Sequence, residues 1–261
     1  MHTYKKPYIS VIIVTWNSAS DIDVCLTSLQ QSLKKYSYEV FIIDNCSSDS
    51  TVSLVKKQHP WVTLLPQKTN WGFGQGNNIG LKKAKGNYIW LLNPDTKVNE
   101  KAVQTMVDFL DKHLSVGVVG PEQYNDKGKL ILMKSRTSAQ GFFEYLIEKI
   151  VAIITEKNTI LFPYPHKTTI LNAGCIMARS NLLPTRQWFN PDCFLYGEEE
   201  YLFTHIRAKK WDAYFLRNCS IIHYREKSIG QTGKKIQFAL DSFILLPIRS
   251  IIAKWKNKRQ T

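Results

Sequence analysis

An apolar run that stops abruptly at a polar turn constrains the fold more than any other segment. The run spans residues 88–92 (YIWLL) and is followed by Asn93, Pro94 and Asp95. Five apolar residues bounded by a proline-containing turn are typical of a buried strand. In an open α/β sheet, ligands bind outside the carboxyl ends of the strands. The sequence therefore predicts that Asp95 lies at a ligand-binding edge of a sheet, or that residues 93–95 form an ordinary Asx or proline turn.

A second buried strand ends in the same way. Residues 39–44 (EVFIID) end in Asp44, and a polar segment that begins with Asn45 follows. Asp44 can accept hydrogen bonds from a nucleotide base or a ribose, or it can cap the next helix. Two strands that each end in an aspartate indicate a site for a phosphate-bearing ligand and a hard divalent ion, because Mg²⁺ and Mn²⁺ prefer oxygen ligands.

Strands and helices alternate through the first half of the chain. Continuous apolar runs predict strands at residues 8–15, 39–44, 61–65, 88–92 and 116–119. Helical spacing predicts helices at 21–33, 49–57 and 100–113, and a glycine-rich segment, 70–78, leads into a helix that ends near Gly86. This alternation predicts an α/β fold with a mostly parallel, doubly wound central sheet and helices on both faces.

The rhythm changes after Gly120. The pattern there predicts a helix at 140–154, a loop at 155–168, a strand at 169–178, a helix at 200–209 and one or two short strands within 213–224.

The charge balance favours an anionic partner. The chain has 35 Lys and Arg against 21 Asp and Glu, a formal net charge of +14. Residues 233–261 hold seven basic residues and one acid among apolar residues. This tail can lie on an anionic membrane surface, or it can be a packed helix with a solvated basic end. Five cysteines without a CxxC pair indicate reduced thiols in a cytosolic protein.

Three further segments carry candidate chemistry. Residues 72–78 (GFGQGNN) let the backbone approach a ligand closely, or they form a plain tight turn. Residues 198–200 are three glutamates. Crowded carboxylates disfavour one another's ionisation, which suits one of them to act as a general base, although acids are also common at helix N-termini. His223 follows an apolar run and precedes Arg225, so it can ligate a metal, donate to a phosphate or cap a strand.

The order of these motifs resembles that of the family-two glycosyltransferases with the GT-A fold, in particular their rhamnosyltransferase-like branch. The matching segments are VIIVTWN (11–17), IDNCSSD (43–49), NWGFGQGNNIG (70–80), LNPD (92–95), NAGC (172–175), FLYGEE (194–199), and His223 with Ser228. The resemblance implies a GT-A domain over residues 1–232, followed by the basic tail, 233–261. Its donor-binding half would span about residues 1–120, and its acceptor and catalytic half about residues 121–232.

The resemblance also implies a role for each matching residue. Glu199 matches the catalytic base, and Glu198 is the alternative base. Asp95 and His223 would hold a divalent metal ion, Mn²⁺ or Mg²⁺. The residues that would bind the substrates are Thr15, Asn17, Asp44, Asn45, Gly74, Asn78, Asn93, Arg225 and Ser228. Three places depart from the family pattern: Asn93 replaces an acid, Glu199 replaces an aspartate, and Glu200 with Tyr201 replaces a region where the family often has a second aspartate.

The implied activity is the inverting transfer of a sugar from a nucleotide-diphosphate sugar, dTDP-rhamnose or a UDP-hexose. The acceptor would be a glycan or a lipid-linked glycan in bacterial surface polysaccharide synthesis. The protein would be cytoplasmic and could lie at the inner face of the cell membrane.

Three other functions compete with this one. The Glu198–Glu199 pair makes a non-catalytic relative that binds nucleotide sugars the main alternative. A nucleic-acid-binding protein would explain the charge but not the acidic strand ends, and the sequence has no nucleic-acid-binding motif. A nucleotidyltransferase would need a lysine-containing, glycine-rich loop directly after the first strand, and this sequence has none there.

Overall fold

The computed structural model describes residues 6–130, 147, 150, 151, 165–168, 170–183, 185–194 and 198–224. Most of the predicted helix 140–154 and the whole tail 233–261 lie outside these residues. None of the helices in the described part of the chain is long and apolar enough to cross a membrane.

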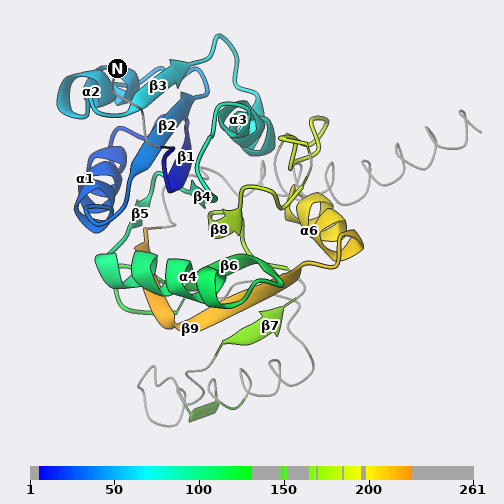
Figure 1. Cartoon of the computed structure of the whole chain (residues 1–261). Helices are drawn as coiled ribbons and strands as arrows, with labels where there is room; N and C mark the ends of the chain where they lie inside the picture. The colour runs from blue at the N-terminus through cyan, green and yellow to red at the C-terminus, as the bar shows by residue number, and fades with distance from the viewer. Residues whose placement is uncertain are drawn as a thin grey trace, which may run out of the picture.

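The first half of the chain forms a four-stranded parallel sheet with helical connections (Figure 1). Its elements are β1 (Ile9–Thr15), α1 (Ile22–Ser32), β2 (Tyr38–Asp44), α2 (Thr51–Gln58), β3 (Thr63–Pro66), α3 (Gly72–Leu81) and β4 (Tyr88–Leu92). The strands lie in the order β3-β2-β1-β4. Runs such as ISVIIVT and YIWLL are buried on both faces, which is why they lack polar alternation.

The second half extends the same sheet with mixed pairing. Its elements are β5 (Thr96–Lys97), α4 (Glu100–Lys112), β6 (Val116–Tyr124), β7 (His166–Thr168), β8 (Cys175–Arg179), α6 (Glu198–Ala208) and β9 (Asp212–His223). The order continues β4-β8-β6-β9-β5, with β7 beside β9. β6 and β9 are parallel, whereas β8 runs antiparallel to β4 and β6, and β5 and β7 run antiparallel to β9.

Helices cover both faces of the sheet, as the sequence predicted (Figure 1). One hydrophobic core packs α1, α2 and α4 against one face, and a second packs α3 and α6 against the other. The predicted α/β fold is therefore confirmed, with the parallel strands concentrated in the first half.

Glycines allow α3 to lie directly on the sheet. A Cβ atom at Gly80 would lie 2.6 Å from Ile12 Cγ2, and one at Gly76 would lie 2.7 Å from Val14 Cγ1. Both distances are shorter than real Cβ contacts, so only glycine fits without a shift of its neighbours. The prediction that this glycine-rich segment precedes a helix was wrong, because it is itself the helix.

Three other predicted boundaries were also wrong. Residues 166–168 form a strand within the predicted loop, and β8 begins at Cys175 rather than at residue 169. β6 continues to Tyr124, beyond the predicted end at Val119.

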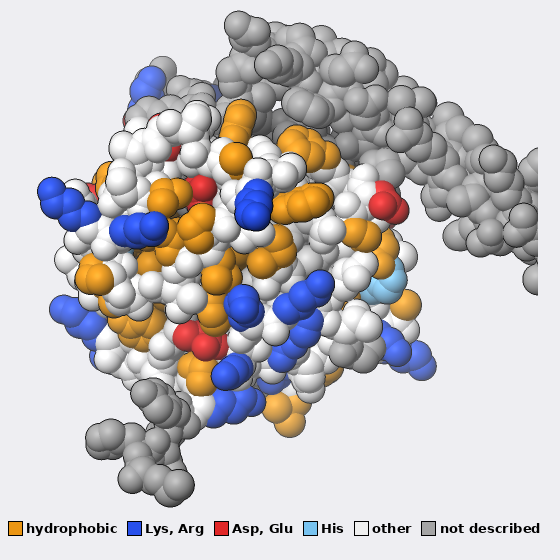
Figure 2. Space-filling model, turned by 90° about the horizontal axis from the view of Figure 1, so that it is seen from above, with side chains coloured by type: hydrophobic (Ala, Val, Ile, Leu, Met, Phe, Trp, Pro, Cys, Tyr) orange, Lys and Arg blue, Asp and Glu red, His pale blue; other side chains and the backbone are white. Residues whose placement is uncertain are grey.

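Exposed basic side chains also occur in the first half of the chain. Six lysines and no Asp or Glu occur between residues 50 and 94, and all six lysines are exposed. Figure 2 shows one face of the molecule with more blue than red side chains, interleaved with hydrophobic ones. The excess of positive charge therefore does not reside in the tail alone.

Candidate active site

Segments from five strands meet at one edge of the sheet. Thr15 at the end of β1 pairs with Asp44 at the end of β2. β4 is parallel to β1, so the turn that carries Asp95 follows at the same edge. β8 runs antiparallel to β4 and begins opposite its end, and β9 finishes with His223 opposite Thr96. The sheet thus places polar residues from distant parts of the sequence side by side.

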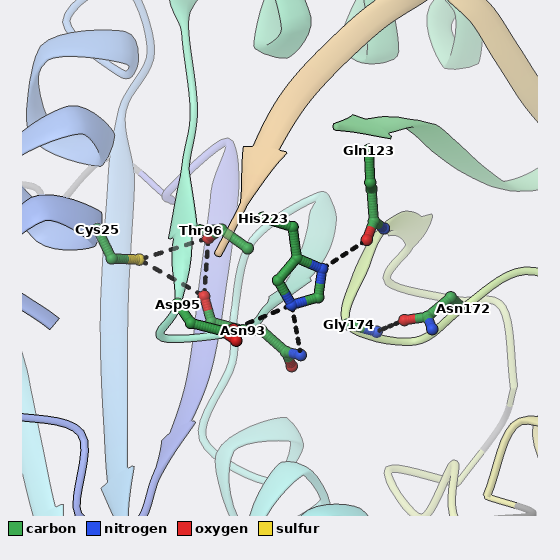
Figure 3. A network of polar contacts seen from close by, with 8 residues as sticks. All are labelled: Cys25, Asn93, Asp95, Thr96, Gln123, Asn172, Gly174 and His223. Atoms are coloured by element: carbon green, nitrogen blue, oxygen red, sulfur yellow. Dashed lines mark hydrogen bonds and ion pairs between the residues drawn. The ribbon is translucent and has the colours of Figure 1, made fainter. Parts of the chain in front are cut away.

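Asp95 and His223 form a close polar pair at this edge (Figure 3). Both side chains are buried, and His223 Nε2 lies 3.0 Å from Asp95 Oδ1. Asn93 Nδ2 lies 3.5 Å from the same ring nitrogen. The backbone fixes the pair, since Tyr224 N donates to the carbonyl oxygen of Asp95 at 2.8 Å. The structure therefore brings together three residues that the sequence assigned to one site.

Helix α1 supports the turn that carries Asp95. Cys25 Sγ lies 3.6 Å from both Asn93 O and Thr96 Oγ1, and Thr96 Oγ1 donates to Asn93 O at 2.7 Å. Burial raises the pKa of the Cys25 thiol to about 12. The thiol therefore stays protonated at neutral pH and can donate to the turn.

The other ring nitrogen of His223 contacts a residue that the sequence did not reveal. His223 Nδ1 lies 2.7 Å from Gln123 Oε1, and Gln123 is 1% exposed. A neutral imidazole carries a single N–H, so it cannot donate to both Gln123 Oε1 and Asp95 Oδ1. A proton on Nδ1 leaves the lone pair of Nε2 beside a carboxylate oxygen.

The spacing of these two atoms suits adjacent ligands of one divalent cation. Octahedral coordination at about 2.1 Å places neighbouring ligand atoms about 3.0 Å apart. The observed distance from Nε2 to Oδ1 is 3.0 Å. Across the described residues, no cluster of three or more His, Cys, Asp or Glu side chains could hold a metal ion. A cation at this pair would therefore take most of its ligands from substrate and water.

The segment before β8 links Glu199 to the same edge. Asn93 N donates to Gly174 O at 2.8 Å, and Ala173 N donates to Glu199 Oε1 at 3.4 Å. A Cβ atom at Gly174 would lie 2.7 Å from Asn172 Oδ1 and 2.8 Å from Asn93 Nδ2. The close fit around Gly174, which Figure 3 shows beside Asn172, keeps α6 and the turn after β4 together.

Asp44 fastens the loop that follows β2. Its Oδ1 accepts from Thr15 Oγ1 at 2.9 Å and from Ser47 Oγ at 2.6 Å, and its Oδ2 accepts from Ser47 N at 2.9 Å. The first residue of α2, Thr51, instead donates its N–H to Asp49 at 2.9 Å. Asp44 therefore stabilises the loop that follows β2 instead of capping helix α2.

Asn17 and Asn45 connect this loop to its neighbours. Asn17 has a φ of 50° and accepts from Ser48 N at 2.8 Å. Asn45 Nδ2 donates to Gly72 O at 2.9 Å. Asn45 Oδ1 is buried without a hydrogen-bond partner in the described part of the chain, so it remains available as an acceptor.

Asn78 ties α3 to the segment that precedes α6. Its Nδ2 donates to Phe189 O at 2.9 Å, and its Oδ1 accepts from Phe189 N at 3.1 Å. Gly74 is buried in the same helix. The donor-binding roles of both residues stay predictions, and Asn78 already has a structural contact.

Three predicted site residues are beyond what the structure describes. Arg225 and Ser228 lie outside the described residues, and so does the side chain of Glu198, although its backbone begins α6. Gln123 was missed because the predicted strand stopped at Val119. The polar residues 122 and 123 within a longer buried strand were the signal that could have revealed it.

A sequence comparison identifies the family to which this arrangement belongs. The sequence model described as "Glycosyl transferase family 2" matches residues 10–180, more than half of the chain. The chain belongs to glycosyltransferase family 2. The matched range includes β2 with Asp44 at its end, β4 with the turn that carries Asp95, and the segment before β8.

Curated relatives of this glycosyltransferase-family chain include enzymes of Staphylococcus aureus. The chain is 32% identical over 110 residues to poly(ribitol-phosphate) β-N-acetylglucosaminyltransferase TarS, a match that covers 41% of this chain and 19% of TarS. It is 29% identical over 127 residues to TarP, which has the same described activity, and this match covers 47% of this chain and 39% of TarP. The matches thus span less than half the length of either relative.

Solved structures of similar proteins show the fold. A crystal structure of S. aureus TarS 1–349 matches with a TM-score of 0.59 at 20% identity, covering 83% of this chain and 60% of that one. A mannosyltransferase from Pyrobaculum calidifontis, in complex with GDP-Man and Mn²⁺, matches with a TM-score of 0.63 at 19% identity, covering 94% and 65%. The predicted GT-A fold is confirmed.

Proposed function

We propose that this protein transfers a sugar from a nucleotide-diphosphate sugar to a hydroxyl group of a glycan or lipid-linked glycan, with inversion at the anomeric carbon. One observation carries the proposal. In a family 2 chain, Asp95, His223 and Asn93 meet at the carboxyl edge of the sheet, and the segment before β8 brings Glu199 to the same edge.

Glu199 is the proposed general base. Its carboxylate would accept the proton of the acceptor hydroxyl as the acceptor oxygen bonds to the anomeric carbon and the bond to the donor diphosphate breaks. The hydrogen bond from Ala173 N to Oε1 orients the Glu199 side chain. A positioned general base contributes about 10²- to 10⁴-fold to a rate. Glu198 is the alternative base.

Asp95 and His223 would hold a divalent cation, Mn²⁺ or Mg²⁺. When bound, this cation would neutralise negative charge on the departing diphosphate. Asn93 would orient the ring of His223 from the neighbouring position. Support for a cation comes from the ligand spacing described above and from Mn²⁺ in the structures of the P. calidifontis enzyme and of GalNAc-T7.

The donor half would consist of the loop beyond Asp44 and the start of α3. Thr15, Asn17, Asp44, Asn45, Gly74 and Asn78 are the proposed donor-contact residues, with Arg225 and Ser228 near the diphosphate. Crystal structures of TarS contain UDP and UDP-GlcNAc. A UDP-hexose is therefore a favoured donor, and dTDP-rhamnose remains the donor that the rhamnosyltransferase-like motifs favour.

The acceptor would belong to bacterial surface polysaccharide synthesis, because several relatives make or modify such polymers according to their names. The basic tail, 233–261, would dock the protein at the cytoplasmic face of the membrane, where lipid-linked acceptors occur. Nucleic acid is not among the proposed partners.

A panel of nucleotide sugars tests the proposal. The purified protein, with and without Mn²⁺, would be screened by thermal shift, and donors that raise Tm would be assayed for release of the nucleoside diphosphate. We expect Asp95→Ala and Glu199→Gln to reduce turnover by about 10²-fold or more. Glu200→Gln is the matched control, because Glu200 is the next residue of α6 and its side chain is exposed.

The results separate this function from its main rival. Wild-type turnover by Asp95→Ala at saturating donor would refute the cation role. A protein that binds a nucleotide sugar tightly but releases no nucleoside diphosphate with any acceptor glycan would be the non-catalytic relative, a reading that the glutamate at position 199 favours.

A further inference from the structure

We infer that Gln123 positions His223 as a metal ligand, by fixing which ring nitrogen carries the proton. This inference rests on the proposed cation site and adds a residue to it. Gln123 extends from β6, and His223 is the last residue of the neighbouring strand β9. The inference depends on three features: the contact between the two side chains, their burial, and the shape of the strands that carry them.

The contact with Gln123 allows His223 to bind a metal ion only through Nε2. Gln123 Oε1 lies 2.7 Å from Nδ1, so a proton on Nδ1 is donated to the amide oxygen. The lone pair then lies on Nε2, which is the nitrogen beside Asp95 Oδ1 and Asn93 Nδ2. Metal-bound histidines generally donate their other N–H to an acceptor in this way, which fixes the ring and raises its basicity.

Both side chains of this contact are buried. Gln123 is 1% exposed and His223 2% exposed, so water cannot easily replace either partner. Gln123 Nε2 has no hydrogen-bond partner among the described residues, and a buried unpaired amide group destabilises a fold. Because this unpaired group destabilises the fold, the stability of the fold does not by itself explain a glutamine at position 123.

A shift in the register of β6 against β9 places Gln123 near His223. The β6–β9 register shifts between Pro121 and Glu122, where Pro121 pairs with Leu216 but Glu122 pairs with Ser220. Beyond the shift, Gln123 pairs with Ile221, two residues before His223. Side chains on neighbouring parallel strands can therefore meet here across a short diagonal.

Metal binding by the free protein provides the test. Mn²⁺ affinity would be measured by titration calorimetry and by the fraction of free Mn²⁺ in electron paramagnetic resonance, without donor. We expect Gln123→Met, which keeps the volume but removes the acceptor, to weaken Mn²⁺ binding about 10- to 100-fold. Gln123→Glu, which keeps an acceptor oxygen, should retain most of the affinity. Gln104→Met, on the exposed face of α4, should change nothing.

Nuclear magnetic resonance gives a second readout that does not depend on metal binding. The ¹⁵N and ¹³C shifts of the metal-free wild-type His223 ring should show the proton on Nδ1, and this preference should disappear in Gln123→Met. Equal Mn²⁺ affinity of a folded Gln123→Met and the wild type would overturn the inference, as would a proton fixed on Nε2 in the wild type. Absence of Mn²⁺ binding by the wild type would overturn it too.

These outcomes are distinct from failure of the proposed function. Sugar transfer with unchanged Mn²⁺ affinity in Gln123→Met would leave the transferase standing without this role for Gln123. Conversely, Gln123-dependent Mn²⁺ binding without release of nucleoside diphosphate from any sugar nucleotide would refute the transferase but not the positioning.

Discussion

Arg217 and Glu122 form a buried ion pair that should control both stability and the shape of the site. Arg217 Nε lies 3.4 Å from Glu122 Oε1, and the two side chains are 6% and 0% exposed. Arg217 is the first of the three β9 residues, 217–219, that lie within the register shift between β6 and β9. Removing the arginine takes a positive charge away from the buried Glu122 carboxylate.

The expected cost of Arg217→Met is about 3–5 kcal/mol in the free energy of unfolding, the range for breaking a buried pair by removing one partner. A domain of this size loses about 2–4 °C in Tm for each kcal/mol, so Tm should fall by about 6–20 °C. Chemical denaturation followed by circular dichroism measures the first quantity, and a thermal scan measures the second.

The double variant Glu122→Leu/Arg217→Met separates charge from packing. It should recover much of the loss, because well-packed apolar residues often replace a buried pair at little or no cost. A loss below about 1 kcal/mol for Arg217→Met would refute the reasoning, and so would a double variant that is less stable than the single one. Reduced Mn²⁺ affinity in a folded Arg217→Met would show in addition that the pair holds Gln123 in place.

Two further predictions concern α3 and the buried thiols. The Gly80→Ala substitution should be relieved by Ile12→Ala, because Ile12 Cγ2 lies 2.6 Å from the Cβ atom that alanine would add. In a double-mutant cycle, Ile12→Ala should therefore destabilise the Gly80→Ala variant by about 1–3 kcal/mol less than it destabilises the wild type. Denaturant melts would measure this coupling, and additive effects would show that α3 does not press on β1. Burial raises the pKa values of Cys25 and Cys175 from 9.0 to about 12, so the unfolded chain releases these protons first and stability should fall between pH 9 and 12 by about 1.4 kcal/mol per pH unit for each thiol. Serine variants at both positions should flatten that slope, and mass spectrometry after brief alkylation at pH 8 should find the exposed Cys46 modified and Cys25 untouched.

The sequence predicted β2 and β4 well because each contains a short apolar run that ends at a polar turn. Both strands begin and end within one residue of their predicted limits. A strand buried on both faces shows a nearly continuous apolar run, which is easy to recognise in a sequence. The same clarity placed Asp44 and Asp95 at strand ends.

The errors arose where tertiary contacts override local preference. Glycine is a poor helix former, so residues 72–81 did not indicate a helix. The close approach of α3 to Ile12 and Val14 explains the glycines, and that approach is visible only in the folded protein. β6 was cut short because the strand-and-helix rhythm changes after Gly120, whereas the sheet continues and accommodates Pro121 at its register shift.

The site itself was predicted only in part. Motif resemblance supplied Asp95, His223 and Glu199, but no local pattern indicates that residues 95 and 223 lie 3.0 Å apart. That proximity follows from the antiparallel pairing of β5 with β9, which joins segments far apart in the chain. Gln123 could not be inferred for the same reason.

The pairing of Thr96 with His223 also has a consequence for biosynthesis. A ribosome delivers Asp95 well before it delivers β9, so the nascent chain carries Asp95 without its contact to His223. The loops after β1 and β2 can take shape early, while Asp95 and His223 meet only when β9 docks between β6 and β5. Under the proposed function, the partly made polypeptide would therefore be inactive until β9 is in place.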